Sequence, residues 1–245
     1  MAKIRLDRIL VERGLAASRE KAQALIMAGH VVVSDRPAVK PGHPVDKDAP
    51  IIVKGNPPYV SRGGIKLAHA LAQFRIDVSG KIALDVGAST GGFTDCLLKH
   101  GAAKVYAVDV GYGQLDQRLR SDPRVVVMER VNAHYSFSLP EKADLATVDV
   151  SFISLTKVLP SVTEHLRPGG YVVALLKPQF EAERREVGKG GVIKDTAIHA
   201  RVLGRAILWV IEHRIRLRGL IPSPILGDKG NREFFLLLEP LPTND

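Results

Sequence analysis

The 245-residue sequence contains a single cysteine, Cys96, so no disulfide can form within the chain and no disulfide-linked partner is expected. Long apolar runs are also absent: the densest, 206–211, lies between Arg205 and Glu212 and is far too short to cross a bilayer. The N-terminus lacks the apolar core of a signal peptide. The eight histidines show no metal-ligand spacing. We therefore expect a cytoplasmic protein with no membrane partner and no metal, in which Cys96 belongs to the core.

Positive charge is concentrated near the N-terminus. The formal net charge is +9, and residues 1–64 hold 11 Lys and Arg against 6 acids, an excess of 5. The other 181 residues therefore supply an excess of 4. A concentrated basic region indicates a polyanionic partner, either nucleic acid or an anionic membrane, although a merely basic solvated surface gives the same pattern.

The first 53 residues predict a small module of two helices and a few short strands. The chain is expected to be helical from residue 3, where apolar residues at helical spacing, beginning at Leu6, predict a helix that ends at Gly14. Ser18 is suited to cap a second helix that ends at Gly29. Strands are expected at 31–33 and 51–53, with a turn at 35–37.

This pattern, which runs from Arg5-Leu6-Asp7 through Gly14-Leu15, Ser18-Arg19 and Gly29 to Val31-x-Val33, resembles the S-four-type RNA-binding domain. Such a module reads structured RNA largely by shape and backbone, so it needs few aromatic residues. The resemblance implies phosphate-seeking side chains, for which the candidates are Lys3, Arg5, Arg8, Arg13, Arg19, Lys21 and Arg36. The linker 55–59 contains two prolines and a glycine, so we expect domains at 1–58 and 59–245.

Strands and helices alternate from residue 81 onward. A helix that begins at or shortly after Ser61 precedes them. Strands are expected at 82–86, 105–110, 125–128, 145–150 and 171–176, followed by a final hairpin of 220–226 with 233–238. Helices are expected between them, near 92–100, 113–120, 154–166 and 196–217. This predicts an α/β, Rossmann-like, mostly parallel seven-stranded sheet with an antiparallel last strand, the architecture of S-adenosylmethionine (SAM)-dependent methyltransferases.

The stretch 81–93 carries the most specific local signal. A buried strand runs through small residues into a helix, which brings backbone N–H groups against a ligand. Its glycines do not have the dinucleotide-binding spacing; the arrangement Asp-x-Gly-x-x-x-Gly-x-Phe instead resembles the SAM loop of methyltransferases. The candidate cofactor-binding residues are Asp85, Gly87, Ala88, Ser89, Thr90, Gly91, Gly92, Phe93, Asp109, Val110 and Asn132. An ordinary strand–loop–helix turn remains the alternative.

Four polar residues are predicted at the carboxyl edge of the sheet, where such folds bind ligands. They are Asp109, Asp149, Lys177 and Glu233, which end strands or, for Glu233, begin the antiparallel one. Asp109 lies 24 residues after Asp85, a spacing suited to holding ribose hydroxyls.

Lys66, Asp149, Lys177 and Glu233, with their neighbours Leu176-Lys177-Pro178 and Asn231-Arg232-Glu233, resemble the catalytic tetrad of FtsJ-like RNA ribose 2′-O-methyltransferases. The sequence around these residues is similar to that of the TlyA, or hemolysin A-like, family over residues 3–239. The resemblance implies SAM-dependent methylation of a ribose 2′-hydroxyl, with cytidine the expected nucleotide, in ribosomal RNA within a ribosomal subunit. It implies Lys177 as general base and Lys66 as positioning cation, with both acids as orienting groups. A lysine accepts a proton only when neutral, and its ordinary pKa is about 10.4.

Several alternatives stay open. The tetrad could form two surface salt bridges, Lys66 with Glu233 and Lys177 with Asp149, without catalysis. The protein could be a non-catalytic RNA-binding or assembly factor, a base methyltransferase, or a membrane-active hemolysin. Asn56-Pro-Pro-Tyr59 spells a base-methylation tetrapeptide but lies in the linker. The basic loop 188–194 could close over RNA or be an ordinary loop.

Overall fold

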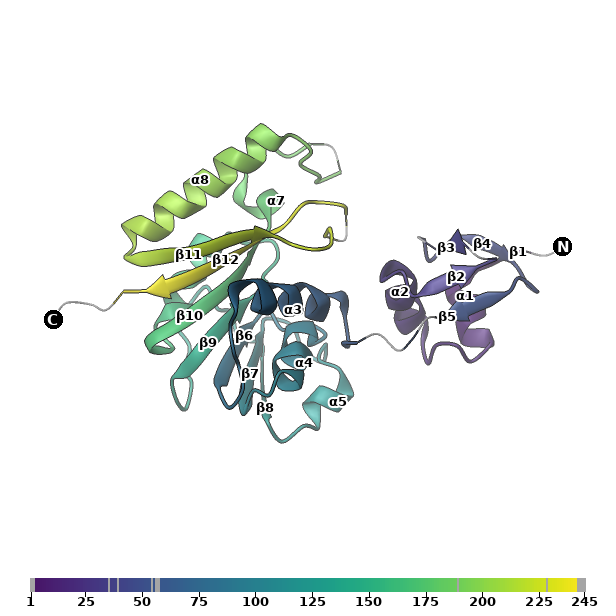
Figure 1. Ribbon diagram of the computed structural model, residues 1–245, viewed down its shortest axis with the longest axis horizontal. Helices are drawn as coiled ribbons and strands as arrows, with labels where there is room; N and C mark the ends of the chain where they lie inside the picture. Colours follow the sequence, from purple (N-terminus) through teal and green to yellow (C-terminus); the bar gives the residue numbers. More distant parts are fainter. Residues whose placement is uncertain are drawn as a thin grey trace. The chain divides into compact units, whose positions relative to one another are not determined.

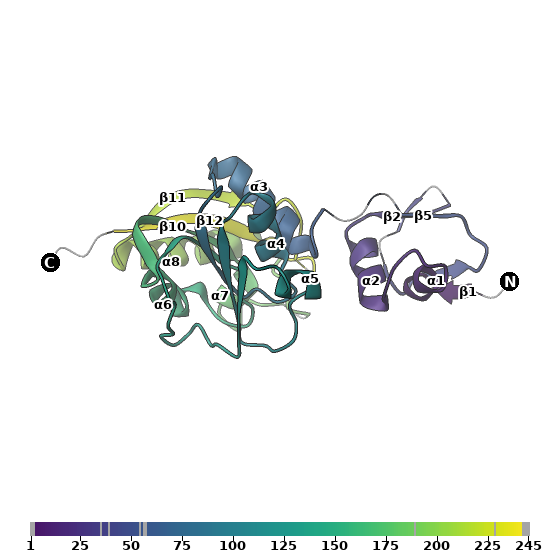
Figure 2. The ribbon, with the colours of Figure 1, turned by 90° about the horizontal axis from the view of Figure 1, so that it is seen from below.

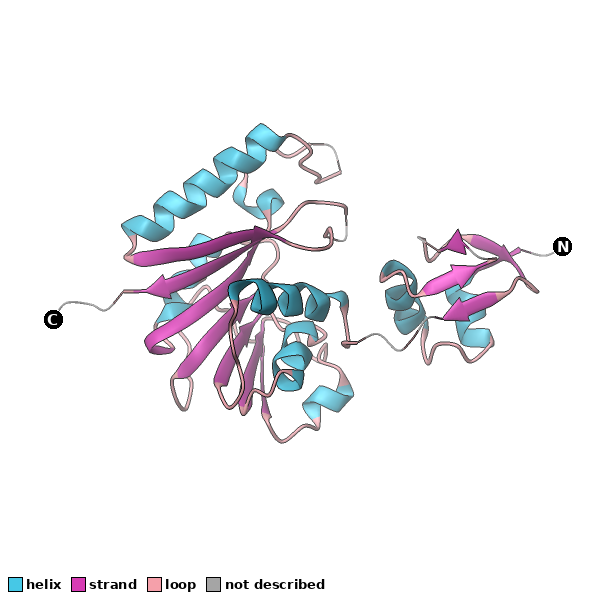
Figure 3. Cartoon of the chain, viewed as in Figure 1, coloured by secondary structure: helices cyan, strands magenta, loops and turns pink. Residues whose placement is uncertain are grey.

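The computed structural model describes residues 3–34, 36–38, 40–53, 55, 58–188, 190–227 and 229–241. Contacts within the chain divide it into two compact units, residues 1–62 and 63–245. Figure 3 distinguishes the helices and strands of each unit.

The N-terminal unit packs two helices against short strands. Its helices are α1 (Leu6–Glu12) and α2 (Arg19–Met27), and the hydroxyl of Ser18 caps α2 by accepting from the N–H of Lys21 at 3.3 Å, as predicted. Strand β2 (Val31–Val33) pairs antiparallel with β3 (Arg36–Pro37) and β5 (Ile51–Val53). Leu6, Ile9 and Ile26 form the centre of its core.

Two expectations for this unit were wrong. Lys3–Arg5 forms strand β1, which pairs antiparallel with β4 (Pro44–Asp46), a partner about 40 residues away that local periodicity cannot reveal. Arg36 and Pro37 form β3 rather than a turn, because they pair with β2. Asp35, the first residue of that predicted turn, lies outside the described residues.

The second unit contains the predicted sheet. Its seven strands are ordered β11-β12-β10-β9-β6-β7-β8, and β12 runs antiparallel to both of its neighbours. The other neighbouring strands are parallel. The bounds are β6 (Ile82–Val86), β7 (Lys104–Asp109), β8 (Val125–Glu129), β9 (Ala143–Val148), β10 (Leu166–Leu176), β11 (Ile215–Pro222) and β12 (Phe234–Pro240). The predicted fold class is therefore confirmed.

Helices cover both faces of this sheet. Figures 1 and 2 show α3 (Arg62–Phe74), α4 (Gly92–Lys99) and α5 (Gln117–Arg120) on one face, and α6 (Leu159–Thr163) and α8 (Thr196–Glu212) on the other. A 3₁₀ turn, η1 (Leu155–Lys157), precedes α6, and α7 (Pro178–Glu181) follows β10. Side chains alternate between the faces along each strand: Leu84 and Val86 belong to the core that includes Val202 of α8.

The structure corrects the predicted boundaries near the C-terminus. The helix that begins at Thr196 ends at Glu212 instead of 217, because Arg214 adopts a left-handed conformation (φ 59°) and Ile215 already begins β11. After its buried first residue, Ile215, strand β11 alternates exposed and partly buried residues as it pairs with β12. The helix expected at 154–166 divides into η1 and α6, and β10 begins at Leu166.

Candidate active site

The loop after β6 approaches the end of β9 very closely. Gly87 has φ +85°, and a Cβ added there would lie 2.5 Å from the carbonyl oxygen of Asp149. Real side chains do not tolerate such a contact, so only glycine fits at this position. Ser89 also has a positive φ, 49°, although it carries a side chain. The sequence of small residues thus brings the loop backbone against the strand that carries Asp149.

A cavity of about 320 Å³ lies beside this loop, and we name it the glycine-loop cavity. Five predicted cofactor-binding residues line it: Gly87, Ser89, Asp109, Val110 and Asn132. The carboxylate of Asp109, at the end of β7, accepts from the N–H of Ser89 at 2.8 Å and from the N–H of Gly111 at 2.6 Å. Backbone donors from two loops therefore fix this carboxylate at the cavity.

The other predicted cofactor-binding residues of the loop lie within the fully described stretch 58–188, and they do not line the glycine-loop cavity. Ala88, Gly91, Gly92 and Phe93 are buried, and Thr90 is exposed.

Asp85 is fully buried and joins β6 to α4 and β9. Its carboxylate accepts from the hydroxyls of Thr94 at 2.7 Å and Thr147 at 2.9 Å. Burial raises the pKa of Asp85 to about 6, against the effect of these hydroxyls. The structure places Asp85 as a support beneath the loop.

The four tetrad residues form two ion pairs. Lys66 of α3 and Glu233, which precedes β12, are both buried, and Lys66 Nζ lies 2.6 Å from Glu233 Oε2. Lys177 follows β10 and Asp149 follows β9, so they lie at adjacent strand ends, and Lys177 Nζ lies 2.6 Å from Asp149 Oδ1. Lys177 also donates to Ser151 Oγ at 2.9 Å.

A second cavity, of about 350 Å³, connects the two pairs; we name it the lysine cavity. Lys177 and Glu233 both line it, and Ser151 and Phe152 line it together with the glycine-loop cavity. Asp149 lines the glycine-loop cavity. The Lys177–Asp149 pair therefore has one member in each of two adjoining cavities at the carboxyl edge of the sheet.

Phe152, which sequence reasoning missed, lies at the junction of the cavities. Its side chain is 89% exposed, and its φ of 63° is unusual for a bulky residue. Its ring lies 5.0 Å from that of Phe180, measured between centroids. Glu181 holds the residues that follow Phe152, because its carboxylate accepts hydrogen bonds from the hydroxyl of Ser154 and the N–H of Leu155. An aromatic residue in the loop that follows the end of β9 was the available signal.

Buried Asn231 fixes the loop beside the lysine cavity. Its side chain accepts from the N–H of Ile193 at 2.9 Å and donates to the carbonyl of Gly191 at 2.8 Å. Gly191 and Val187 line the lysine cavity, so the basic loop 188–194 contributes to the wall of this site. Gly227 leaves room for Glu233, since an added Cβ would lie 2.3 Å from Glu233 Oε1.

In the N-terminal unit, six of the seven predicted RNA-binding side chains are exposed: Lys3, Arg5, Arg8, Arg13, Arg19 and Lys21. Arg13 already donates to the backbone carbonyls of Lys47 and Ala49. Arg5 and Arg19 both contact Asp7. The side chain of Arg36 lies outside what the structure describes.

Over the described residues, no group of three or more His, Cys, Asp and Glu side chains is arranged to hold a metal ion.

The strand order and the glycine loop give the second unit the fold that is found in SAM-dependent methyltransferases. Comparison with family models agrees: residues 59–239 match the FtsJ-like methyltransferase family, and residues 4–51 match the S4 domain. The chain belongs to the FtsJ-like methyltransferase family.

Several relatives are similar to this chain over nearly its whole length. The Bacillus subtilis protein YqxC, provisionally named an rRNA methyltransferase, is 52% identical over 96% of this chain and 85% of its own. The 16S/23S rRNA (cytidine-2′-O)-methyltransferase TlyA of Mycobacterium tuberculosis is 45% identical over 96% and 89%. The solved structure of a provisionally named hemolysin from Streptococcus thermophilus is 43% identical, with a TM-score of 0.77 over 100% of this chain and 92% of that one.

Proposed function

We propose that the protein transfers a methyl group from SAM to a ribose 2′-hydroxyl of ribosomal RNA, with cytidine as the acceptor nucleotide. The observation that carries this proposal is the Lys177–Asp149 pair at the junction of two cavities. A methyl transfer to an alcohol needs one cavity for the donor, one for the acceptor, and a proton acceptor where they meet. The names of the TlyA relatives, rRNA (cytidine-2′-O)-methyltransferases, support the substrate.

The glycine-loop cavity fits the methyl donor. Gly87 and Ser89 would hold its amino-acid part by backbone contacts, and Asp109 is already oriented to accept hydrogen bonds from ribose hydroxyls. Asn132 also lines this cavity, and its amide would contact the adenine base. When bound, SAM supplies a methyl carbon attached to a positively charged sulfur, which needs no further activation.

The lysine cavity would receive the ribose. Lys177 in its neutral form accepts the hydroxyl proton as the oxygen–carbon bond forms and the sulfur–carbon bond breaks. Asp149 and Ser151 hold the Lys177 amine at its place. Lys66 and Glu233 form the opposite, buried pair and orient the acceptor. Much of the acceleration then comes from alignment of the two reactants across the junction.

Residues 1–58 are proposed to bind RNA and residues 59–245 to carry catalysis. The match to the S4 domain and the exposed basic side chains of the N-terminal unit support this division. Deletion of residues 1–58 should weaken binding to ribosomal subunits while SAM binding stays nearly unchanged. Unchanged affinity for the subunits would overturn the assignment of this unit.

The direct test is methylation of unmodified ribosomal subunits with labelled SAM, followed by mass mapping of the labelled nucleotide. Label on a cytidine ribose is the expected result. Label on a base would overturn the 2′-hydroxyl assignment, and no transfer to either subunit would favour a non-catalytic assembly factor. Relatives include a protein named Hemolysin A from Brachyspira hyodysenteriae. Among the described residues of this chain, no helix has the length and apolar character needed to span a bilayer.

A further inference from the structure

In the N-terminal unit, a single buried carboxylate collects three side chains from separate places in the chain. Asp7, in the first turn of α1, has a fully buried side chain. Arg5 donates to it through Nε at 3.0 Å and a terminal nitrogen at 2.8 Å. Arg19 donates through Nε at 3.1 Å, and Gln23 donates through its amide at 2.9 Å.

The two arginines remain accessible although their shared partner is not. Their side chains are 48% and 52% exposed, compared with 0% for Asp7. The hydrogen bonds from Arg5, followed by those from Gln23 and Arg19, hold the pKa of Asp7 well below its usual range, against the opposing effect of burial. The carboxylate is therefore charged, and the cluster of two cations and one anion keeps a positive excess at the surface.

The contacts also fix where each guanidinium lies. Arg5 ends β1, while Arg19 and Gln23 lie one turn apart on α2, so the carboxylate joins both elements to α1. Arg5 is confined further by Gly42, where an added Cβ would lie 3.2 Å from its terminal nitrogen. Arg19 uses Nε, its inner nitrogen, so the contact with Asp7 does not require its terminal N–H groups.

We propose that Asp7 is a positioning residue for RNA binding, which holds Arg5 and Arg19 as a prearranged pair for RNA phosphates. The proposal rests on the RNA-binding function proposed above. Guanidinium groups bind phosphate with directional hydrogen bonds, and a side chain that is already ordered loses less entropy when it binds. The carboxylate orders both arginines during folding, before RNA arrives.

Simple charge counting predicts the opposite effect for this residue. Asp7→Asn removes a negative charge from a basic face, so electrostatics alone would strengthen binding to a polyanion. If Asp7 positions the arginines, the same substitution weakens binding by about tenfold, the scale expected from releasing two long side chains. Glu12→Gln is the matched control, because Glu12 is exposed on the same helix and its substitution removes an equal negative charge. This control should bind equally well or more tightly.

The experiment measures binding of the full-length protein to purified ribosomal subunits over a range of salt concentrations. Each phosphate contact contributes about 0.7–0.9 to the slope of log affinity against log salt. Asp7→Asn should therefore lower both the affinity and the magnitude of this slope, although no cation has been removed. Wild-type or tighter binding by Asp7→Asn would overturn the proposal. Failure of the wild-type protein to bind either subunit would instead overturn the RNA-binding function itself.

A double-mutant comparison separates positioning from loss of folding. In a chain that already carries Arg5→Gln and Arg19→Gln, Asp7→Asn should change RNA affinity little, because no arginines remain to be positioned. If Asp7 only maintains the fold, the substitution should lower affinity by the same factor in both backgrounds. Equal losses in the two backgrounds would refute the positioning role.

Discussion

Lys177 Nζ lies 2.6 Å from Asp149 Oδ1, and the two residues line different but adjoining cavities. Their side chains are 12% and 21% exposed, so this is not the solvated surface pair that typically contributes only about 0–1 kcal/mol. The ion-pair alternative and the catalytic interpretation share this geometry. They differ in what removal of the lysine does to methyl transfer.

Lys177→Met removes the proposed proton acceptor with little change in side-chain length. Methyl transfer should fall by about 100-fold or more, the scale of lost general-base catalysis, while SAM affinity stays nearly unchanged. Initial rates with labelled SAM and calorimetric titration would measure the two quantities. Lys157→Met, at an exposed lysine of η1, is the control and should retain normal rates. Normal turnover by Lys177→Met would leave only an ion pair.

Gly87→Ala should abolish SAM binding and destabilise the second unit by about 2 kcal/mol or more. The new Cβ would lie 2.5 Å from the carbonyl oxygen of Asp149, and the backbone at residue 87 has φ +85°. Gly80→Ala separates strain from collision, because Gly80 has φ +68° with nothing within 4 Å of the added Cβ. It should cost only about 1 kcal/mol and leave SAM binding intact. Similar losses in both variants would refute the close-approach argument.

Much of the second unit could be predicted from its sequence because the information is local. Continuous apolar strands and small-residue turns placed β6 and the glycine loop, and the family resemblance supplied the tetrad. The boundary between α8 and β11 could not be predicted, since helical apolar spacing continues into a strand that only pairing with β12 defines.

The site itself was less predictable than the fold. Which lysine pairs with which acid follows from strand order and side-chain placement, and the sequence alone suggests both pairs only as a non-catalytic alternative. Phe152 was missed because its exposure depends on a left-handed backbone at one residue. Asp7 could be placed on α1, but its burial depends on contacts with residues 12 and 16 positions away.

Asp85 predicts a specific dependence of stability on pH. Its pKa is raised from 3.8 to about 6 by burial, so the folded state keeps the proton at pH values where the unfolded chain has lost it. The contribution of this group is complete below the unfolded pKa and is lost as pH rises through 6, a change of about 3 kcal/mol. Asp85→Asn should therefore gain stability relative to wild type as pH rises from about 4 to about 7.

Trp209, the only tryptophan, lies on α8 and reports unfolding of the second unit by fluorescence. Asp122→Asn is the opposing control, because hydrogen bonds from Arg124 lower the pKa of Asp122. Its carboxylate stabilises the fold above the unfolded pKa, so this variant should lose stability relative to wild type as pH rises. Parallel pH profiles for the two variants would contradict the assignment of Asp85.

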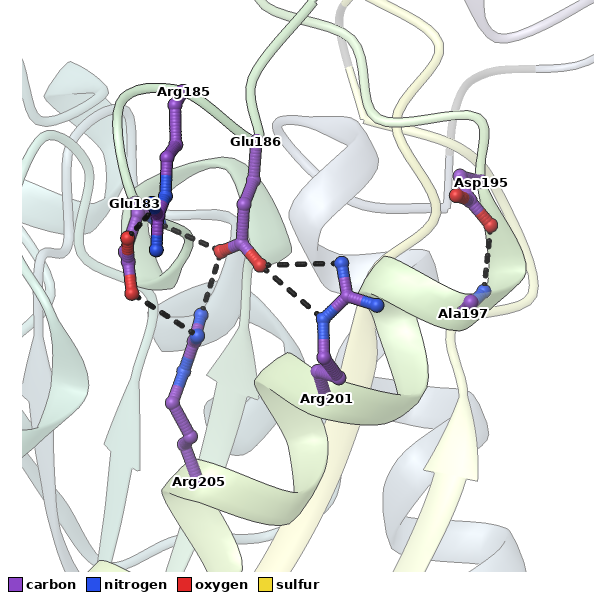
Figure 4. Close-up of polar contacts among 7 residues, drawn as sticks. All are labelled: Glu183, Arg185, Glu186, Asp195, Ala197, Arg201 and Arg205. Atoms are coloured by element: carbon purple, nitrogen blue, oxygen red, sulfur yellow. Dashed lines mark hydrogen bonds and ion pairs between the residues drawn. The ribbon is translucent and has the colours of Figure 1, made fainter.

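Glu186 should control the wall of the lysine cavity. Its carboxylate binds Arg205 at 2.9 Å and Arg201 at 3.4 Å, and it accepts from the N–H of Glu183, as Figure 4 shows. These contacts hold the segment before Val187, which lines the lysine cavity, against α8. Glu186→Gln should raise the KM for RNA and leave SAM affinity unchanged. Glu212→Gln, exposed at the end of the same helix, should leave both unchanged.

The pH dependence of this network has the opposite sign to that of Asp85. The pKa of Glu186 is lowered to about 2, and hydrogen bonding from Arg205 is the largest cause. Its contribution to stability is present above the unfolded pKa and disappears as pH falls toward 2. If Glu186→Gln loses the contacts with Arg201 and Arg205 at neutral pH and its KM for RNA is unchanged, the segment before Val187 does not shape the lysine cavity.

Phe152→Gly should separate stability from activity. Glycine adopts φ 63° without strain, so the free energy of unfolding should stay the same or rise. Loss of the exposed ring removes an aromatic surface at the mouth of both cavities, where an RNA base would stack. Base–aromatic stacking contributes about 1–3 kcal/mol, so kcat/KM for RNA should fall by about fivefold or more. Leu208→Ala, at an exposed residue of α8, should retain full kcat/KM. Unchanged kcat/KM in Phe152→Gly would show that the strained backbone presents this ring for some purpose other than RNA contact.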